Sequence, residues 1–105
     1  MRLEIHQLEG QDTRRRVFNR HVDIERAHNS YTAAFYYEGT FYSSDPQRTI
    51  KESLSQLIRN LQQKGYCKLC TRLNFRGRRY FAEQEPWIHY EDVAQNGREA
   101  DTSKS

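Results

Sequence analysis

The sequence predicts an α+β fold, in which one long amphipathic helix packs on one face of an antiparallel sheet of about five to six strands. Three observations support this prediction. Residues 46–64 carry one apolar stripe at helical spacing, and the segments on both sides of them alternate as strands do. The chain has 105 residues, which is the usual size of one domain.

Two strands are expected before residue 26. RLEIHQL, residues 2–8, gives a weak alternation through Leu3 and Ile5. VFNRHVDIE, residues 17–25, alternates more clearly, with the apolar side made by Phe18, Val22 and Ile24. Between them EGQDTRRR, residues 9–16, predicts an exposed loop.

An aromatic hairpin is predicted at residues 31–44, YTAAFYYEGTFYSS, with a tight turn at Glu38 and Gly39. Alternation places Phe35 on one side of the sheet and Tyr36 on the other. One aromatic side is expected to face the helix. The second side needs another cover, which the N-terminal strands, a partner protein or a second copy of the chain would provide.

The helix is predicted over residues 46–64. Asp45 is expected to be its N-cap, Pro46 its first helical residue and Gly65 the residue just past its end. Its apolar stripe consists of Ile50, Leu54, Leu57, Ile58 and Leu61. We therefore expect one face on the sheet and the other in water.

A second hairpin is predicted at residues 66–83, YCKLCTRLNFRGRRYFAE, turning around Arg76 and Gly77. PWIHY, residues 86–90, predicts a last short strand, which Pro86 would enter. Residues 1–93 are thus expected to form a single domain. Residues 94–105, AQNGREADTSKS, show no apolar periodicity and predict a flexible C-terminal tail.

The composition is that of a polar chain that still folds. Hydrophobic residues make up 35% and aromatic residues 12% of the chain, with a mean hydropathy of -1.08. Disordered segments lack aromatic residues, so a globular protein is expected. The first ten residues contain charges and no apolar run, and no segment approaches the roughly 20 apolar residues of a membrane span. No signal peptide, no membrane contact and a cytoplasmic location are therefore expected.

The only two cysteines, Cys67 and Cys70, have a spacing found in redox pairs and in zinc sites. In a regular strand Cys67 would point with Leu69 and Leu73, and Cys70 would point the opposite way. Thiols on opposite faces cannot close a disulfide or hold one metal ion. A zinc site also needs four ligands, and no second cysteine pair exists. The pattern favours a buried Cys67 and an incidental Cys70.

Catalytic signals are weak. His21, Asp23 and Glu25 share one side of a strand and carry ligand types that suit a divalent metal. A strand with one side in water shows the same alternation, however, and this structural interpretation is favoured. The chain has no Gly-rich phosphate loop, no G-x-S-x-G motif and no H-E-x-x-H motif. The sequence therefore predicts a non-enzymatic protein without a cofactor or a metal.

Charge is spread unevenly along the chain. Net charge is +3 and the pI is near 9.0. Residues 66–81 hold five basic residues and no acidic one, whereas residues 82–105 hold six acidic residues and two basic ones. A basic block beside an acidic segment indicates an anionic partner or a tail that covers its own basic face, and an ordinary solvated surface explains it equally well.

The basic hairpin is the strongest functional candidate. Arginines neutralise phosphates and flat rings stack on unpaired bases, so together they suit RNA or single-stranded DNA. The candidate nucleic-acid-binding residues are Arg72, Arg76, Arg78, Arg79, Tyr80 and Phe81. The run from Arg14 to Arg16 would extend the basic surface if its loop lies nearby. FRGRRYF does not match the RNP1 motif.

Three functions follow, in order of preference. The first is a small binding module that contacts RNA or single-stranded DNA through this hairpin. The alternative is a protein-interaction or assembly factor, with a homodimer or other homo-oligomer as one form of it, that uses the second aromatic side and a free sheet edge. The third is a metal-dependent enzyme built on the HVDIE segment.

Overall fold

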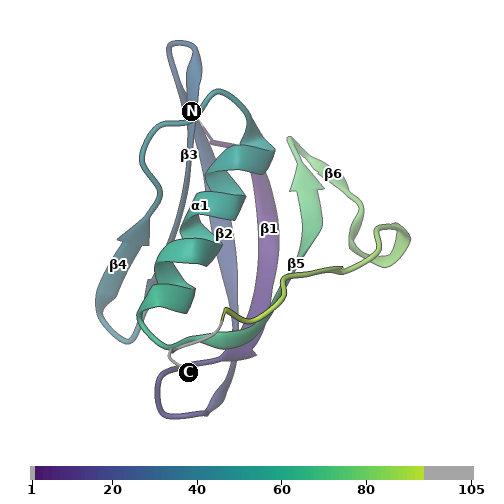
Figure 1. Ribbon diagram of the computed structural model, residues 1–105. Coiled ribbons are helices and arrows are strands. Elements are labelled where there is room, and N and C mark those ends of the chain that lie inside the picture. Colours follow the sequence, from purple (N-terminus) through teal and green to yellow (C-terminus); the bar gives the residue numbers. More distant parts are fainter. Residues whose placement is uncertain (1, 94–105) are drawn as a thin grey trace.

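The computed structural model describes residues 2–93, and the predicted tail at 94–105 lies outside them (Figure 1). The predicted α+β class is confirmed: one α-helix packs on an antiparallel sheet. The elements are β1 (Arg2–Gln11), β2 (Val17–Ala27), β3 (Ser30–Tyr37), β4 (Thr40–Ser43), α1 (Ile50–Gln63), β5 (Cys67–Arg76), β6 (Arg79–Tyr80) and β7 (Ile88–His89), with a short 3-10 helix at Ala82–Gln84.

The N-terminal strand β1 lies in the middle of the sheet. The strand order is β4-β3-β2-β1-β5-β6, and β7 also pairs with β5. The first four strands form a meander, after which α1 crosses back over the sheet so that β5 can pair with β1. β6 and β7 pair with different parts of β5, at Phe75 and at Cys70 respectively.

Both predicted hairpins are confirmed, and their turns explain their registers. Glu38 and Gly39 have φ values of 49° and 81°. Two successive residues at positive φ make the kind of turn whose twist matches that of antiparallel strands. In the second hairpin Arg76 pairs with Arg79, so Gly77 and Arg78 form a two-residue loop in which Gly77 has a φ of 60°.

The helix is shorter than predicted and begins later. It has 14 residues and its N-cap is Thr49, whose hydroxyl accepts a hydrogen bond of 3.0 Å from the backbone N–H of Glu52. The expected cap at Asp45 with Pro46 as first helical residue is therefore wrong. The physical reason is that Gln47 exchanges two backbone hydrogen bonds with Tyr31, which keeps this segment extended beside β3.

The core lies between α1 and one face of the sheet, here called the helix side. The predicted apolar stripe is confirmed, since its members from Leu54 to Leu61 are buried. Phe18 stands among three other aromatic rings, with ring centroids 5.0 to 6.5 Å apart. The sheet residues of the core are Leu8, Phe18, Val22, Ile24, Ala33, Phe35, Tyr37 and Leu69.

The expected exposed loop at residues 9–16 is shorter than predicted. β1 continues to Gln11, and Asp12 is buried. Only the residues that follow Asp12 form the turn into β2, which lies at the far end of the sheet from the β5–β6 turn (Figure 1).

The prediction that Cys67 points with Leu69 and Leu73 is also wrong, whereas Cys70 points away from Leu73 as predicted. Lys68 has a φ of 54° and marks a bulge where the register between β1 and β5 shifts. Cys67 and Cys70 pair with Gln11 and Glu9, which are two residues apart, so both cysteines lie on the same side of the sheet. Cys70 is the buried one, and both thiols are free. Burial raises the pKa of the Cys70 thiol, which keeps it protonated at neutral pH.

One helix cannot cover this whole sheet. A helix is about 10 Å wide, and neighbouring strands lie about 4.8 Å apart, so it covers two to three strands. β6 extends beyond α1 in Figure 1, and the face opposite the helix, here called the open side, carries exposed Tyr36 and Phe41. Among the described residues, no helix has the length and apolar content needed to cross a membrane.

Candidate functional site

The tip of the β5–β6 hairpin presents two free arginines. Arg78 stands in the two-residue loop and Arg79 begins β6, and both are exposed. Within residues 2–93, neither guanidinium takes part in an ion pair. The short loop holds the two positive charges at one end of the sheet, where they remain available to an anion.

An exposed aromatic ring lies next to these arginines. Tyr80 pairs with Phe75 across the hairpin, with ring centroids 5.1 Å apart, and Tyr80 is 54% exposed. Phe75 pairs in turn with Ile5 of β1. Because Ile5 alternates with the buried helix-side residues of β1, the Tyr80 ring lies on the open side, supported from behind by Phe75.

The Phe81 ring does not join the exposed Tyr80 ring but contacts two arginine side chains. The guanidinium carbons of Arg76 and Arg79 lie 5.5 and 5.1 Å from the centroid of its ring. These are cation–π distances, so the ring supports both side chains. The register thus separates the two aromatic candidates, with Tyr80 presented to solvent and Phe81 half-buried under Arg76 and Arg79.

Arg76 is held by a buried carboxylate. Its Nε donates a hydrogen bond of 2.9 Å to Glu4, and the second oxygen of Glu4 lies 2.7 Å from Nε2 of His6. The hydrogen bond from His6, followed by that from Arg76, outweighs burial and lowers the pKa of Glu4. Arg76 therefore joins β5 to β1, and its charge is largely compensated.

Arg72 is not brought to the tip. It pairs with Gln7 in the register, four residues before Arg76, which is about 13 Å along a strand. Its guanidinium carbon lies 4.4 Å from the ring centroid of Trp87, and its Nε is buried without a hydrogen bond. This arginine packs against the segment before β7 rather than facing solvent beside Arg78.

A groove joins the hairpin tip to the start of β1. Its volume is about 320 Å³, and Leu3, Ile5 and Phe75 give it an apolar floor. Arg2 and Arg78 also line it. Arg2 lies 3.6 Å from Asp23 and was not among the predicted site residues. No local signal identifies it, because only the pairing of Glu4 with Arg76 brings the first residues of the chain to the tip.

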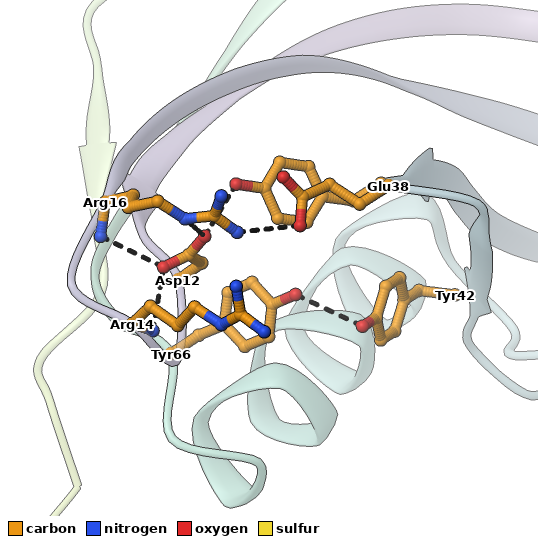
Figure 2. Close-up of polar contacts among 7 residues, drawn as sticks. Asp12, Arg14, Arg16, Glu38, Tyr42 and Tyr66 are labelled. Carbon is orange, nitrogen blue, oxygen red and sulfur yellow. Dashed lines mark hydrogen bonds and ion pairs between the residues drawn. The ribbon is translucent and has the colours of Figure 1, made fainter.

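The run from Arg14 to Arg16 does not extend this surface. It follows Gln11, which pairs with Cys67 at the other end of β5. Figure 2 shows Asp12 between Arg14 and Arg16, with dashed lines from both to its carboxylate. Arg16 lies 2.9 Å from Asp12 and 2.7 Å from Glu38, so its charge is paired.

Asp12 organises this end of the sheet. It is 2% exposed and accepts hydrogen bonds from the backbone of Arg14 and Arg16, from Arg16 Nε and from the Tyr37 hydroxyl. Burial alone would raise its pKa, but the bonds from Tyr37 and the backbone lower the pKa to about 2. The same bond raises the pKa of Tyr37, so its hydroxyl remains a donor. All these groups satisfy one another, which indicates a structural cluster.

We expect the contribution of Asp12 to the free energy of unfolding to depend on pH. Its pKa is lower in the folded chain than the ordinary 3.8, so its contribution is complete above about pH 4 and is lost as the pH falls towards 2. Asp12→Asn should therefore lower the urea midpoint at pH 7, and its difference from the native chain should shrink towards pH 2. Asp23→Asn on the open side is the control. A difference for Asp12→Asn that stays constant with pH would contradict this assignment.

The HVDIE segment lies on β2, away from the hairpin tip. His21 and Glu25 are exposed, and Asp23 approaches Arg2. Among residues 2–93, no group of three or more His, Cys, Asp or Glu side chains is placed to hold a metal ion. Asp23 and Glu25 instead give β2 an acidic character on the open side, to which Glu9 of β1 adds.

A second exposed aromatic pair lies at the opposite edge. Tyr36 and Phe41 face each other across the β3–β4 hairpin with ring centroids 4.8 Å apart, and they are 68% and 55% exposed.

No protein-family model, curated protein or solved structure matches this chain. Its function therefore has to be inferred from its own side chains.

Proposed function

We propose that this protein is a small non-enzymatic module that binds RNA or single-stranded DNA at the tip of the β5–β6 hairpin. The observation that carries this proposal is the position of Tyr80. Its exposed ring is backed by Phe75, and in the sequence it directly follows two arginines that have no ion pair in the described residues. Arg78 lies in the loop, and the side chain of Arg79 lies over Phe81 on the other face of the hairpin. A stacking surface next to unpaired positive charges fits a nucleotide, which joins a flat base to a phosphate.

The geometry favours an unpaired strand over a duplex. Tyr80 can stack only on a base whose face is free, and bases in a duplex are already stacked on both faces. The groove floored by Leu3, Ile5 and Phe75 offers a second apolar surface next to the tip. Arg2 and Arg78 line the same groove, where they would contact the phosphates that flank such a base.

Charge on the open side limits the path of a bound strand. Glu25 and Asp23 lie on β2 opposite Arg2 and Ile5, and Glu9 lies near the other end of β1. Phosphates that cross the sheet beyond the tip would therefore be repelled. A bound strand therefore follows the hairpin tip and the start of β1 and does not cross the sheet. We expect a short site of a few nucleotides with modest affinity.

The six candidate residues take different roles in this proposal. Arg78 and Arg79 contact phosphates, and Tyr80 stacks on a base. Arg76 and Phe81 position these groups, because Arg76 is bonded to Glu4 and Phe81 lies under Arg79. Arg72 lies outside the contact, while Arg2 joins it.

The test is fluorescence anisotropy with short labelled single-stranded RNA and DNA. With two or three phosphate contacts, affinity should fall about tenfold between about 50 mM and about 200 mM salt. A duplex of the same sequence should bind more weakly than the single strand at each salt concentration. Absence of binding at the lower salt concentration, or binding that does not respond to salt, would overturn the proposal.

A second candidate function rests on Tyr36 and Phe41. These two exposed rings occupy the β4 edge, where backbone groups of a short strand are open to pairing with another chain. They favour a protein-interaction or assembly factor, with a second copy as one partner. Salt-insensitive association of copies in light scattering, together with no nucleic-acid binding, would favour this function over the first.

A further inference from the structure

A cavity lies between α1 and β7 on the helix side, away from the hairpin groove. Its volume is about 340 Å³, and its lining is mostly apolar. The lining residues include His6, Ile50, Leu54, Ser55, Ile88 and Tyr90. It exists because α1 packs chiefly against β3 and reaches β5 less closely, so the part of the helix side next to β7 is left without a cover.

The most deeply buried polar group of the lining, His6, has an unused hydrogen-bonding site. His6 is 8% exposed, and its Nε2 lies 2.7 Å from Glu4, which Arg76 also holds. A hydrogen bond to a carboxylate fixes the ring proton on the nitrogen that makes the bond. The other ring nitrogen, Nδ1, has no hydrogen bond within residues 2–93, and in the neutral ring it carries a lone pair.

Other buried polar groups around the cavity already have partners. The Tyr90 hydroxyl lies 2.9 Å from the hydroxyl of Thr71, and the Tyr90 backbone N–H donates to the carbonyl of Leu69. These bonds fix the wall made by Tyr90. His6 is therefore the most deeply buried group in the wall that can still gain a hydrogen bond from a ligand, and the half-buried Ser55 hydroxyl is a second such group.

We propose that this cavity binds a small, mostly apolar molecule that carries one hydroxyl or N–H group, which donates a hydrogen bond to Nδ1 of His6. The volume lies within the range of small-molecule sites, which are apolar with few polar groups. Lys51 also lines the cavity, and its positive charge disfavours a cationic ligand. An uncharged single ring or fused ring pair with one donor meets these requirements. This site is separate from the proposed nucleic-acid contact.

Phenol and toluene are suitable probes, because they have nearly the same shape and differ in one hydroxyl group. Binding is followed by NMR chemical shifts of the full-length protein as each probe is titrated. We expect both probes to shift resonances of Leu54, Ile88 and Tyr90, and phenol alone to shift Nδ1 of His6. Phenol is better hydrated than toluene, so the informative quantity is the ratio of the two dissociation constants in different variants.

His6→Leu should reduce the preference for phenol over toluene by about two- to tenfold, the effect of one hydrogen bond. Ser55→Phe should fill the cavity from the helix and abolish binding of both probes, while Arg59→Phe on an exposed position of the same helix should leave binding unchanged. Should His6→Leu fail to fold, the Nδ1 shift and the Ser55→Phe variant still decide the question. Binding of neither probe at millimolar concentration, unchanged binding in Ser55→Phe, an unchanged ratio in His6→Leu or an Nδ1 that does not respond to phenol would each overturn the proposal.

Discussion

Replacing Arg78 and Arg79 together by alanine is expected to weaken binding to single-stranded RNA and DNA by at least about tenfold. Both side chains are exposed and have no ion pair among the described residues, so their charges are available to phosphates. Loss of two phosphate contacts should also reduce the slope of log affinity against log salt by roughly 1.4. Anisotropy titrations at several salt concentrations measure both quantities.

The matched control is the double variant Arg14→Ala with Arg15→Ala. It removes the same charge, but its residues lie in the β1–β2 turn at the far end of the sheet (Figure 1). The control should keep most of the affinity and the native salt slope. Equal losses in the two double variants would show that net charge, and not the hairpin tip, determines binding.

The largest expected effect on stability is that of Leu57→Ala. Leu57 is 1% exposed at the centre of the apolar stripe of α1. Truncation of a buried leucine leaves a cavity and costs about 2–5 kcal/mol. A domain of this size has about 5–15 kcal/mol in total, so a large part of its stability would be lost.

Urea denaturation followed by far-UV circular dichroism measures this loss. Val17→Ala is the control, because Val17 is a large apolar residue at an exposed position of β2 and should lose little stability on truncation. A Leu57→Ala variant as stable as Val17→Ala would mean that α1 does not pack on the sheet as described.

Local patterns predicted the elements that depend on local chemistry. The α1 stripe follows from helical spacing, and the two turns follow from Gly39 and Gly77, since glycine tolerates positive φ. The start of α1 was missed because the backbone pairing of Gln47 with Tyr31 competes with the cap signal at Asp45. That competition is not visible in the sequence between residues 45 and 49.

Other errors have their cause in distant contacts. Glu4 and His6 occupy buried positions of β1, so the strand lacks the apolar alternation that would mark it as central. Arg76, which compensates Glu4, is 72 residues away in the sequence. The bulge at Lys68 likewise reversed the expected face of Cys67, since a single extra residue shifts the alternation of a strand.

The candidate functional residues likewise divide into those that local sequence identifies and those that only distant contacts bring to the site. Arg78, Arg79 and Tyr80 could be identified because one hairpin carries them all. Arg2 could not, because it reaches the tip only through the pairing of β1 with β5. Arg72 was included by its position in a basic segment, and its contact with Trp87 could not be read from the sequence.

The central place of β1 has a consequence for the cooperativity of this fold. The segment from β1 to β4 would leave one edge of β1 unpaired, and the segment from α1 to β7 would leave β5 without the strand to which it is bonded. Neither half buries the helix stripe, since that core uses side chains from both. We therefore expect no smaller unit within residues 2–93 to fold independently, and we expect these residues to unfold in one cooperative transition.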